Sequence, residues 1–382
     1  MSSLPWWGYP IILAGALALS FVLVPIAVSV AVRHGWLDRP GPAKSHREAV
    51  PYLGGAAIVV SFAAVVVIGN AVDPPPSGLP QLIGFLGLGA LLACVGLVDD
   101  LSGGLSPWLR LALEVVAGIA VWAMGSDAHL AGVPKPVDAL ISILWVVGIT
   151  NAFNLLDNMD GLSAGTAGIA ALAIFGVSAL QHRYLVSALA LALAGCAAGF
   201  LRSNFHPAKI YMGDAGSLFL GFVLAVLLLK LRANAPTRVP VAVILTIPGL
   251  ALFDTSLVVV TRIARRTSPF RGGQDHTSHR LVRLGLSVPA AVGILYAVDL
   301  ALGGAAVGMS ELGDVVRVAG IVALVVVASL AAIGLSRSPA APRQPDRDGA
   351  EHAPEPASTA SMTASGSARD GPRRRWAALA RR

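Results

Sequence analysis

Long apolar runs and short polar segments alternate along most of the chain. An apolar run of about 20 residues can cross the roughly 30 Å hydrocarbon core of a bilayer as a helix. The pattern predicts eleven such helices, at about residues 10–32, 53–72, 81–98, 108–125, 137–156, 161–180, 184–201, 213–231, 239–261, 287–308 and 315–336. We therefore predict an all-α polytopic membrane protein.

The last part of the chain has a different pattern. Residues 337–382 are rich in Pro, Ala, Ser, Thr and charged side chains, and they contain few residues that a core could bury. Such a composition is typical of disordered segments. We predict a transmembrane domain over residues 1–336 and a disordered, basic cytoplasmic tail over residues 337–382.

The composition supports a membrane protein and excludes a soluble globular one. Hydrophobic residues make up 55% of the chain and charged residues only 13%, whereas about 25% is usual for charged residues in soluble domains. The net charge is +7. Because the positive charge is concentrated in particular loops, we interpret it as an orientation signal and as attraction for anionic substrates, not as nucleic-acid binding.

Lys and Arg residues indicate the orientation. They gather after the first and ninth predicted helices and in the tail, whereas segments 73–80 and 309–314 have none. The excess of positive charge in cytoplasmic loops then predicts an N-terminus outside and a C-terminus in the cytoplasm. Lys230, Arg232 and Arg238 fall on the outer side and go against this rule.

Four polar blocks interrupt the apolar pattern, and the predicted topology places all of them on the cytoplasmic side. The block at 150–165 contains three amides and two carboxylates, Asn151, Asn154, Asn158, Asp157 and Asp160. On a helix the three amides would share one face. Amides can bind a sugar or base, and carboxylates offer hard oxygens to Mg²⁺. A simple loop, with these residues as caps and turn formers, is the alternative.

Two further blocks contain carboxylates. Asp99 and Asp100 end a predicted helix in block 97–104, where they repel one another and oppose the helix dipole. This cost favours a functional role. Asp214 lies in block 204–221, where it can hold a metal ion or serve as a helix N-cap, and backbone N–H groups there could meet phosphate oxygens.

Basic side chains mark two other segments. Lys44 and His46 lie in block 44–55, where membrane anchoring is the favoured alternative, and the adjacent Gly54-Gly55 pair allows close approach by a ligand or another helix. His276 and His279 are three residues apart in loop 262–286. Too few ligands surround them for zinc, so an anion site is the better interpretation, with solvated loop histidines as the alternative.

Carboxylates for Mg²⁺, cations for phosphates and a location at the membrane surface together favour phosphoryl transfer between a soluble nucleotide derivative and a lipid phosphate. A secondary transporter is the alternative class. It would place its ionisable groups near the middle of the bilayer, often at broken helices.

Five motifs then point to a family. KSHREAVPYLGG, LVDDLSGG, NAFNLLDNMDGLSAG, YMGDAGSLFLG and DHTSHRL occur in this order, and the chain from about residue 33 to about 286 resembles the polyprenyl-phosphate N-acetylhexosamine-1-phosphate transferases. The resemblance implies transfer from a UDP-HexNAc to a polyprenyl phosphate, with Mg²⁺ or Mn²⁺, releasing UMP. It also implies a bacterial plasma membrane, an active site on its cytoplasmic face and cell-envelope glycan synthesis. A homodimer is compatible with it.

The same resemblance assigns roles to residues. Those expected in catalysis are Asp99, Asp100, Asp157, Asp160, His276 and His279. Those expected to bind substrate are Lys44, His46, Asn151, Asn154 and Arg280. Those expected to hold the metal ion are Asp214 and Asp157. A lipid phosphate is mostly dianionic at pH 7, with a second pKa of about 6, so we expect Asp99 to act mainly through electrostatics and positioning.

The chain departs from the family pattern at three places. Ser278 replaces one histidine of the common H-x-H-H motif, and Asn158 stands where Gly is usual. The sequence VPYLGG differs from the TPTMGG of the phospho-N-acetylmuramoyl-pentapeptide transferases, and their triple histidine is missing. The pattern therefore favours N-acetylglucosamine as the sugar, with the muramoyl-pentapeptide activity as the alternative.

Overall fold

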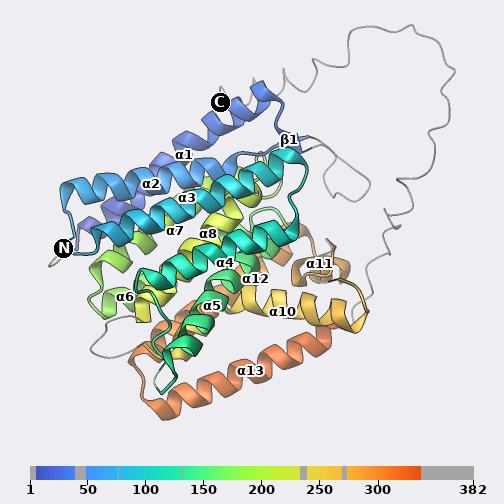
Figure 1. Ribbon diagram of the computed structural model, residues 1–382. Helices are drawn as coiled ribbons and strands as arrows, with labels where there is room; N and C mark the ends of the chain where they lie inside the picture. The colour runs from blue at the N-terminus through green and yellow to red at the C-terminus, as the bar shows by residue number, and fades with distance from the viewer. Residues whose placement is uncertain are drawn as a thin grey trace, which may run out of the picture.

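The structure is a computed structural model that describes residues 6–38, 49–75, 77–130, 132–232, 239–268 and 273–336. These residues form thirteen helices and one short hairpin (Figure 1). The elements are α1 Gly8–His34, β1 Leu37–Asp38, β2 Val50–Pro51, α2 Gly54–Val72, α3 Leu79–Ser102, α4 Pro107–Ala123, α5 Lys135–Leu156, α6 Leu162–Leu180, α7 Tyr184–Asn204, α8 Gly213–Arg232, α9 Val241–Thr246, α10 Gly249–Ala264, α11 Thr277–Arg283, α12 Val288–Glu311 and α13 Asp314–Ser336. The prediction of an all-α protein is confirmed. The predicted tail lies outside the described residues.

The predicted apolar runs appear as helices, but not all as single membrane-length ones. In the described part of the chain, eight helices are long and apolar enough to cross a membrane. The fourth run forms the 17-residue α4. The ninth run forms two helices, α9 and α10, which break at Ile247 and Pro248, because proline cannot donate the backbone hydrogen bond that would continue the helix.

Helix α8 is the centre of the bundle. Almost all of its residues are buried, and it packs against α2, α3, α5 and α6, while α1 and α7 form a second layer against α2 and α6. In Figure 1, α13 lies at the margin of the bundle, where it contacts α10 and α12. The site described below is built on the N-terminal end of the central helix.

Glycines allow the helices around α8 to approach closely. A Cβ atom on Gly55 of α2 would lie 2.2 Å from the backbone nitrogen of Gly216 in α8. A Cβ atom on Gly96 of α3 would lie 2.4 Å from the carbonyl carbon of Asp214. The Gly54-Gly55 pair was expected to admit a ligand or a helix, and it admits a helix. The acidic end of α3 is thereby held against the start of α8.

The turn between α3 and α4 follows from its sequence. Gly103 ends α3 with a positive φ of 84°, a conformation that costs glycine little. Pro107 begins α4, where its fixed φ suits the first helical position. This short reversal brings the last turn of α3 and the first turns of α4 side by side.

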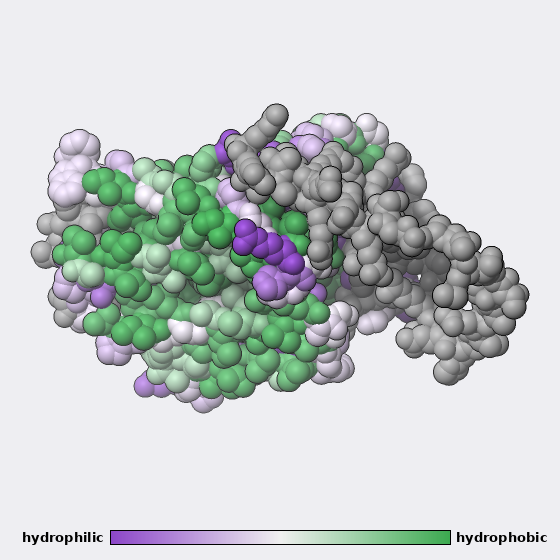
Figure 2. Space-filling view, turned by 90° about the horizontal axis from the view of Figure 1, so that it is seen from above, coloured by the Kyte–Doolittle hydropathy of each residue, from purple (hydrophilic) through white to green (hydrophobic). Residues whose placement is uncertain are grey.

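The surface is largely apolar, as a lipid-facing surface must be. Figure 2 shows hydrophobic residues over most of the described face that it presents. Exposed branched side chains such as Val60, Val67 and Ile83 belong to the long apolar helices. Because water would disfavour so much exposed apolar area, these helices are consistent with a multi-pass membrane protein.

Two of the three cations that go against the charge rule have structural partners, and Lys230 lies over the ring of Phe85. Arg232 is buried, and its guanidinium donates to the carbonyl oxygens of Ala128 at 2.5 Å, Val239 at 2.8 Å and His129 at 3.1 Å. Arg232 therefore ties the α4–α5 loop to the segment before α9. Arg238 lies outside the described residues.

Candidate active site

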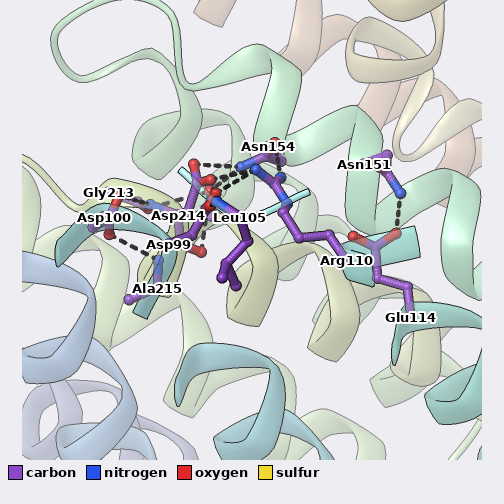
Figure 3. A network of polar contacts seen from close by, with 11 residues as sticks. Asp99, Asp100, Leu105, Arg110, Glu114, Asn151, Asn154, Gly213, Asp214 and Ala215 are labelled. Carbon is purple, nitrogen blue, oxygen red and sulfur yellow. Dashed lines mark hydrogen bonds and ion pairs between the residues drawn. The ribbon is translucent and has the colours of Figure 1, made fainter. Parts of the chain in front are cut away.

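A polar cluster lies where α3, α4, α5 and α8 meet (Figure 3). At its centre, Arg110 of α4 places Nη1 2.6 Å from Oδ2 of Asp99 and 2.6 Å from Oδ2 of Asp214. Nη2 of Arg110 donates to Oδ1 of Asn154 at 2.9 Å. One guanidinium thus joins side chains from three other helices, so distant parts of the chain meet in one place.

Two side chains of the cluster make further contacts that fix them. Asn154 donates from Nδ2 to Oδ1 of Asp214 at 2.8 Å and to Oγ of Ser217 at 2.9 Å. Asp99 also accepts from the backbone N–H of Leu105 in the α3–α4 turn. The orientation of each group is therefore set by partners on two sides.

Asp100 caps the central helix from outside. Its carboxylate accepts from the backbone N–H groups of Asp214 at 3.1 Å and Ala215 at 3.4 Å. A carboxylate at a helix N-terminus satisfies free donors and complements the helix dipole. Two of the N–H groups that were expected to meet phosphate oxygens are therefore occupied by Asp100.

The α5–α6 turn carries the next two acids. Helix α5 ends at Leu156, so Asn158 lies beyond it and the prediction that three amides share one helix face is wrong for Asn158. Asp157 follows the helix directly. Burial raises the pKa of Asp157 to about 8, and the charges of Asp214 and Asp100 add to the increase. A nearby cation would stabilise the ionised form of this carboxyl group.

Asp160 turns away from the cluster. Its Oδ2 lies 2.8 Å from Nδ1 of His206 and accepts from the backbone N–H of Ala208 at 3.0 Å. Asp160 therefore holds the loop between α7 and α8, which leads into Gly213 and Asp214. These contacts place it as a support for the start of α8.

Asn151 lies one turn before Asn154 on α5 and pairs with a second buried acid. Its Nδ2 donates to Oε2 of Glu114 in α4 and to the carbonyl oxygen of Val147 at 2.9 Å. Glu114 is 2% exposed and lies four residues after Arg110. The same face of α4 thus presents both a cation and an acid to α5.

His276 directly precedes the short helix α11, and His279 lies within it. His276 is buried, and its Nδ1 lies 2.7 Å from Oδ2 of Asp254 in α10. The other oxygen of Asp254 accepts from the backbone N–H of Thr277 at 2.6 Å. Burial lowers the pKa of His279 to about 4, and His276 and Arg283 add to the decrease. His279 is therefore a neutral imidazole at pH 7.

Arg280, expected to bind substrate, has protein partners. Nε donates to the carbonyl oxygen of Asp275 at 2.7 Å, Nη1 to that of Leu335 at 2.8 Å and Nη2 to Oγ1 of Thr261 at 3.1 Å. It is 1% exposed. Its side chain joins α11 to α10 and α13. Lys44 and His46 lie outside the described residues.

Three contributors were not singled out from the sequence, namely Arg110, Glu114 and Asp254. Each is an ionisable residue inside a predicted membrane helix. Ionisable groups inside membrane helices are costly and usually functional, so their position was a usable signal.

The donor set suits a magnesium ion. Within the described residues, no group of three or more His, Cys, Asp and Glu side chains is placed to hold a metal ion. Asp99 and Asp214 nevertheless direct one oxygen each at a single cationic nitrogen, 2.6 Å away in both cases. Mg²⁺ is commonly held by one or two carboxylates, with substrate phosphates and waters completing its shell. Two convergent carboxylates fit that requirement.

Comparisons with known proteins match the part of the chain that carries this cluster. The profile of glycosyl transferase family 4 matches residues 82–232, which run from α3 to the end of α8 and include Asp99, Arg110, Asn154 and Asp214. The chain is 30% identical over 283 residues to a probable undecaprenyl-phosphate N-acetylglucosaminyl 1-phosphate transferase of Bacillus subtilis, with 72% of this chain and 77% of the relative covered.

Two other relatives carry related names. The chain is 29% identical to a decaprenyl-phosphate N-acetylglucosaminephosphotransferase of Mycolicibacterium smegmatis, over 83% of this chain and 86% of the relative. It is 28% identical to a phospho-N-acetylmuramoyl-pentapeptide-transferase of Streptococcus mutans, over 56% of this chain and 71% of the relative. By the match to the family profile and the extent of these similarities, the chain belongs to glycosyl transferase family 4.

Proposed function

We propose that this protein transfers N-acetylglucosamine 1-phosphate from UDP-N-acetylglucosamine to a polyprenyl phosphate. The products are UMP and a polyprenyl diphosphate that carries the sugar, for use in cell-envelope glycan synthesis. The observation that carries the proposal is the convergence of Asp99, Asp214 and Asn154 on Arg110 at one end of an apolar helix bundle. The relatives named for transfer of N-acetylglucosamine phosphate cover more of the chain than the muramoyl-pentapeptide relative does.

The reaction is a substitution at phosphorus. An oxygen of the lipid phosphate forms a bond to the sugar-linked phosphorus, and the bond from that phosphorus to the oxygen of UMP breaks, leaving its electron pair on UMP. Because a phosphate monoester has a second pKa of about 6, the attacking phosphate is already ionised at pH 7 and needs no strong base. Positioning and charge compensation are then the main tasks of the protein.

The described side chains can perform these tasks. Arg110 supplies a forked cationic donor that suits phosphate oxygens, and Asn154 offers an amide beside it. Asp99 and Asp214 would hold Mg²⁺, or Mn²⁺ in its place, with Asp157 close enough to affect them electrostatically. A bound divalent ion would compensate phosphate charge and orient the reacting groups. His279, neutral at pH 7, can hydrogen-bond a diphosphate oxygen.

Turnover by the purified protein tests this proposal. The protein in detergent receives polyprenyl phosphate, Mg²⁺ and either UDP-N-acetylglucosamine or UDP-N-acetylmuramoyl-pentapeptide, and UMP release is measured. We expect UMP only with UDP-N-acetylglucosamine and only when the lipid phosphate is present. UMP release with the pentapeptide donor alone would instead assign the peptidoglycan activity.

A second measurement separates an enzyme from a transporter. A transferase of this kind exchanges labelled UMP into the UDP-sugar in a reaction that needs lipid phosphate and Mg²⁺. A transporter moves a solute without making or breaking a covalent bond. Absence of exchange by folded protein under all these conditions would refute the enzymatic proposal.

A further inference from the structure

Two residues that depart from the family pattern contact one another. Ser278 of α11 stands where a histidine is common, and Asn158 of the α5–α6 turn stands where glycine is usual. In the structure, Oγ of Ser278 donates to Oδ1 of Asn158 at 2.5 Å. The two positions are 120 residues apart in the sequence, so the sequence pattern did not show that the departures belong together.

The surroundings of both residues hold this contact in place. Ser278 is 1% exposed, so water does not compete for its hydroxyl group. Asn158 donates from Nδ2 to the carbonyl oxygen of Leu155 at 2.8 Å, which leaves Oδ1 to face Ser278. A buried hydroxyl that loses its acceptor incurs the full cost of its desolvation.

This hydrogen bond attaches α11 to a different element than its other polar contacts do. His276 and Thr277 attach α11 to Asp254 in α10, and Arg280 attaches it to α10 and α13. Among the polar contacts of the described residues, the Ser278–Asn158 bond is the one that joins α11 to the turn that carries Asp157. It therefore connects the helix that carries His279 to the turn that carries Asp157.

We propose that Ser278 and Asn158 form a positioning pair that sets the placement of His279 relative to Asp157, and that they act as one exchangeable unit. The inference rests on the proposed function. In a site for phosphoryl transfer, displacement of a binding group by about 1 Å can cost up to 100-fold in rate.

A double-mutant cycle on the full chain tests the coupling. We expect Ser278→Ala and Asn158→Ala each to lower kcat/KM for the nucleotide sugar by about tenfold to 100-fold. The kcat/KM of the double variant should be no lower than that of the less active single variant, because either change removes the same bond. Ser310→Ala, which removes another hydroxyl of low exposure at the far end of α12, is the control and should keep wild-type turnover.

A reciprocal exchange tests the unit itself. Ser278→His alone places an imidazole against the Asn158 side chain and should lower activity, and Asn158→Gly alone removes the acceptor. Together they should restore kcat/KM to within about threefold of wild type, since coupled sites compensate one another. A residue that merely supports folding would not give this rescue, and melting temperatures of all variants check that the fold is intact.

The outcomes separate the two proposals. Wild-type protein that is inactive on both nucleotide sugars overturns the proposed function and the positioning role with it. Active wild-type protein whose single-variant losses multiply in the double variant, or whose Asn158→Gly change fails to improve Ser278→His, overturns the pair alone.

Discussion

Arg110 is the residue on which the cluster depends. It neutralises part of the charge that Asp99 and Asp214 bring together, and it lies in an apolar helix where an unpaired cation would be costly. In the proposed reaction, a divalent ion held by the two carboxylates would allow the same guanidinium to bind phosphate.

We expect Arg110→Ala to lower kcat/KM by about 100-fold or more, because it removes a preorganised cationic donor. Arg110→Lys should recover only part of the loss, since lysine cannot divide a planar fork between two partners. UMP release by the purified variants is the measurement. Arg202→Ala is the control, because Arg202 lies over the ring of Phe21 near the end of α7. Activity of Arg110→Ala within threefold of wild type would remove Arg110 from the site.

His279 predicts a dependence of stability on pH. Its pKa is about 4 in the folded protein against about 6.5 in an unfolded chain, so the unfolded state binds more protons between these values. The stabilisation is fully present above pH 6.5 and is lost as the pH falls towards 4. His279→Gln lacks this titration. As the pH falls from 7 to 4.5, its melting temperature should therefore rise relative to that of wild type.

Melting curves in detergent at several pH values check this expectation. His182→Gln, which changes an exposed histidine between α6 and α7, is the matched control. A constant difference between wild type and His279→Gln across the range would mean that His279 is not held neutral by burial.

Some residues of the site were predictable and others were not. Asp99, Asp100 and Asp214 stand at ends of apolar runs, and the alternation of helices places those ends on one side, so the sequence predicted that they gather. The division of labour among them was not predictable. Asp100 caps α8, whereas Asp160 holds the α7–α8 loop. These roles depend on the directions of the side chains, which cannot be predicted from the spacing of the residues.

At the scale of elements, helix α8 determines where the acids stand. Its first turn carries Asp214, Asp100 closes that turn from α3, and Gly96 lets α3 approach. The apolar runs predicted the helices themselves because hydrophobic length is a strong signal. The break in the ninth run depends on Pro248. The position of Asn158 outside α5 depends on the turn that ends at Gly161, which has a positive φ. A continuous apolar or polar pattern does not show either feature.

Gly96→Ala should therefore separate α3 from α8. The added Cβ atom would lie 2.4 Å from backbone atoms of Asp214, so one helix must shift, and we expect kcat/KM to fall by about tenfold or more. Gly87→Ala in the same helix is a matched control, because its Cβ atom meets nothing within 4 Å. It should keep wild-type activity. Equal behaviour of the two variants would show that the α3–α8 approach does not position the site.

At the scale of the whole molecule, the polar cluster and α11 lie at the same end of the bundle as the hairpin β1–β2 (Figure 1). The basic residues of α10 and α11 lie there too, whereas Arg232 at the opposite end is enclosed by carbonyl oxygens. The orientation rule assigns the end with the excess of Lys and Arg to the cytoplasm. We therefore propose that the N-terminus lies outside and that the site and the C-terminus lie in the cytoplasm.

Reporter fusions test this orientation. Green fluorescent protein after the last residue should fluoresce in bacterial cells, and alkaline phosphatase at the same position should be inactive. Alkaline phosphatase inserted between α4 and α5 should be active, because that loop lies at the opposite end from the site. The reverse pattern at both positions would invert the topology.

Arg280 has a practical consequence for work with shortened versions of the protein. It binds the carbonyl oxygen of Leu335 in the last turn of α13 while belonging to the helix that carries His279. The C-terminal end of α13 is therefore an integral support of α11. Any truncation should begin after Ser336. An earlier cut that removes Leu335 would leave the buried guanidinium of Arg280 without one of its acceptors and would weaken the attachment of α11 to α13.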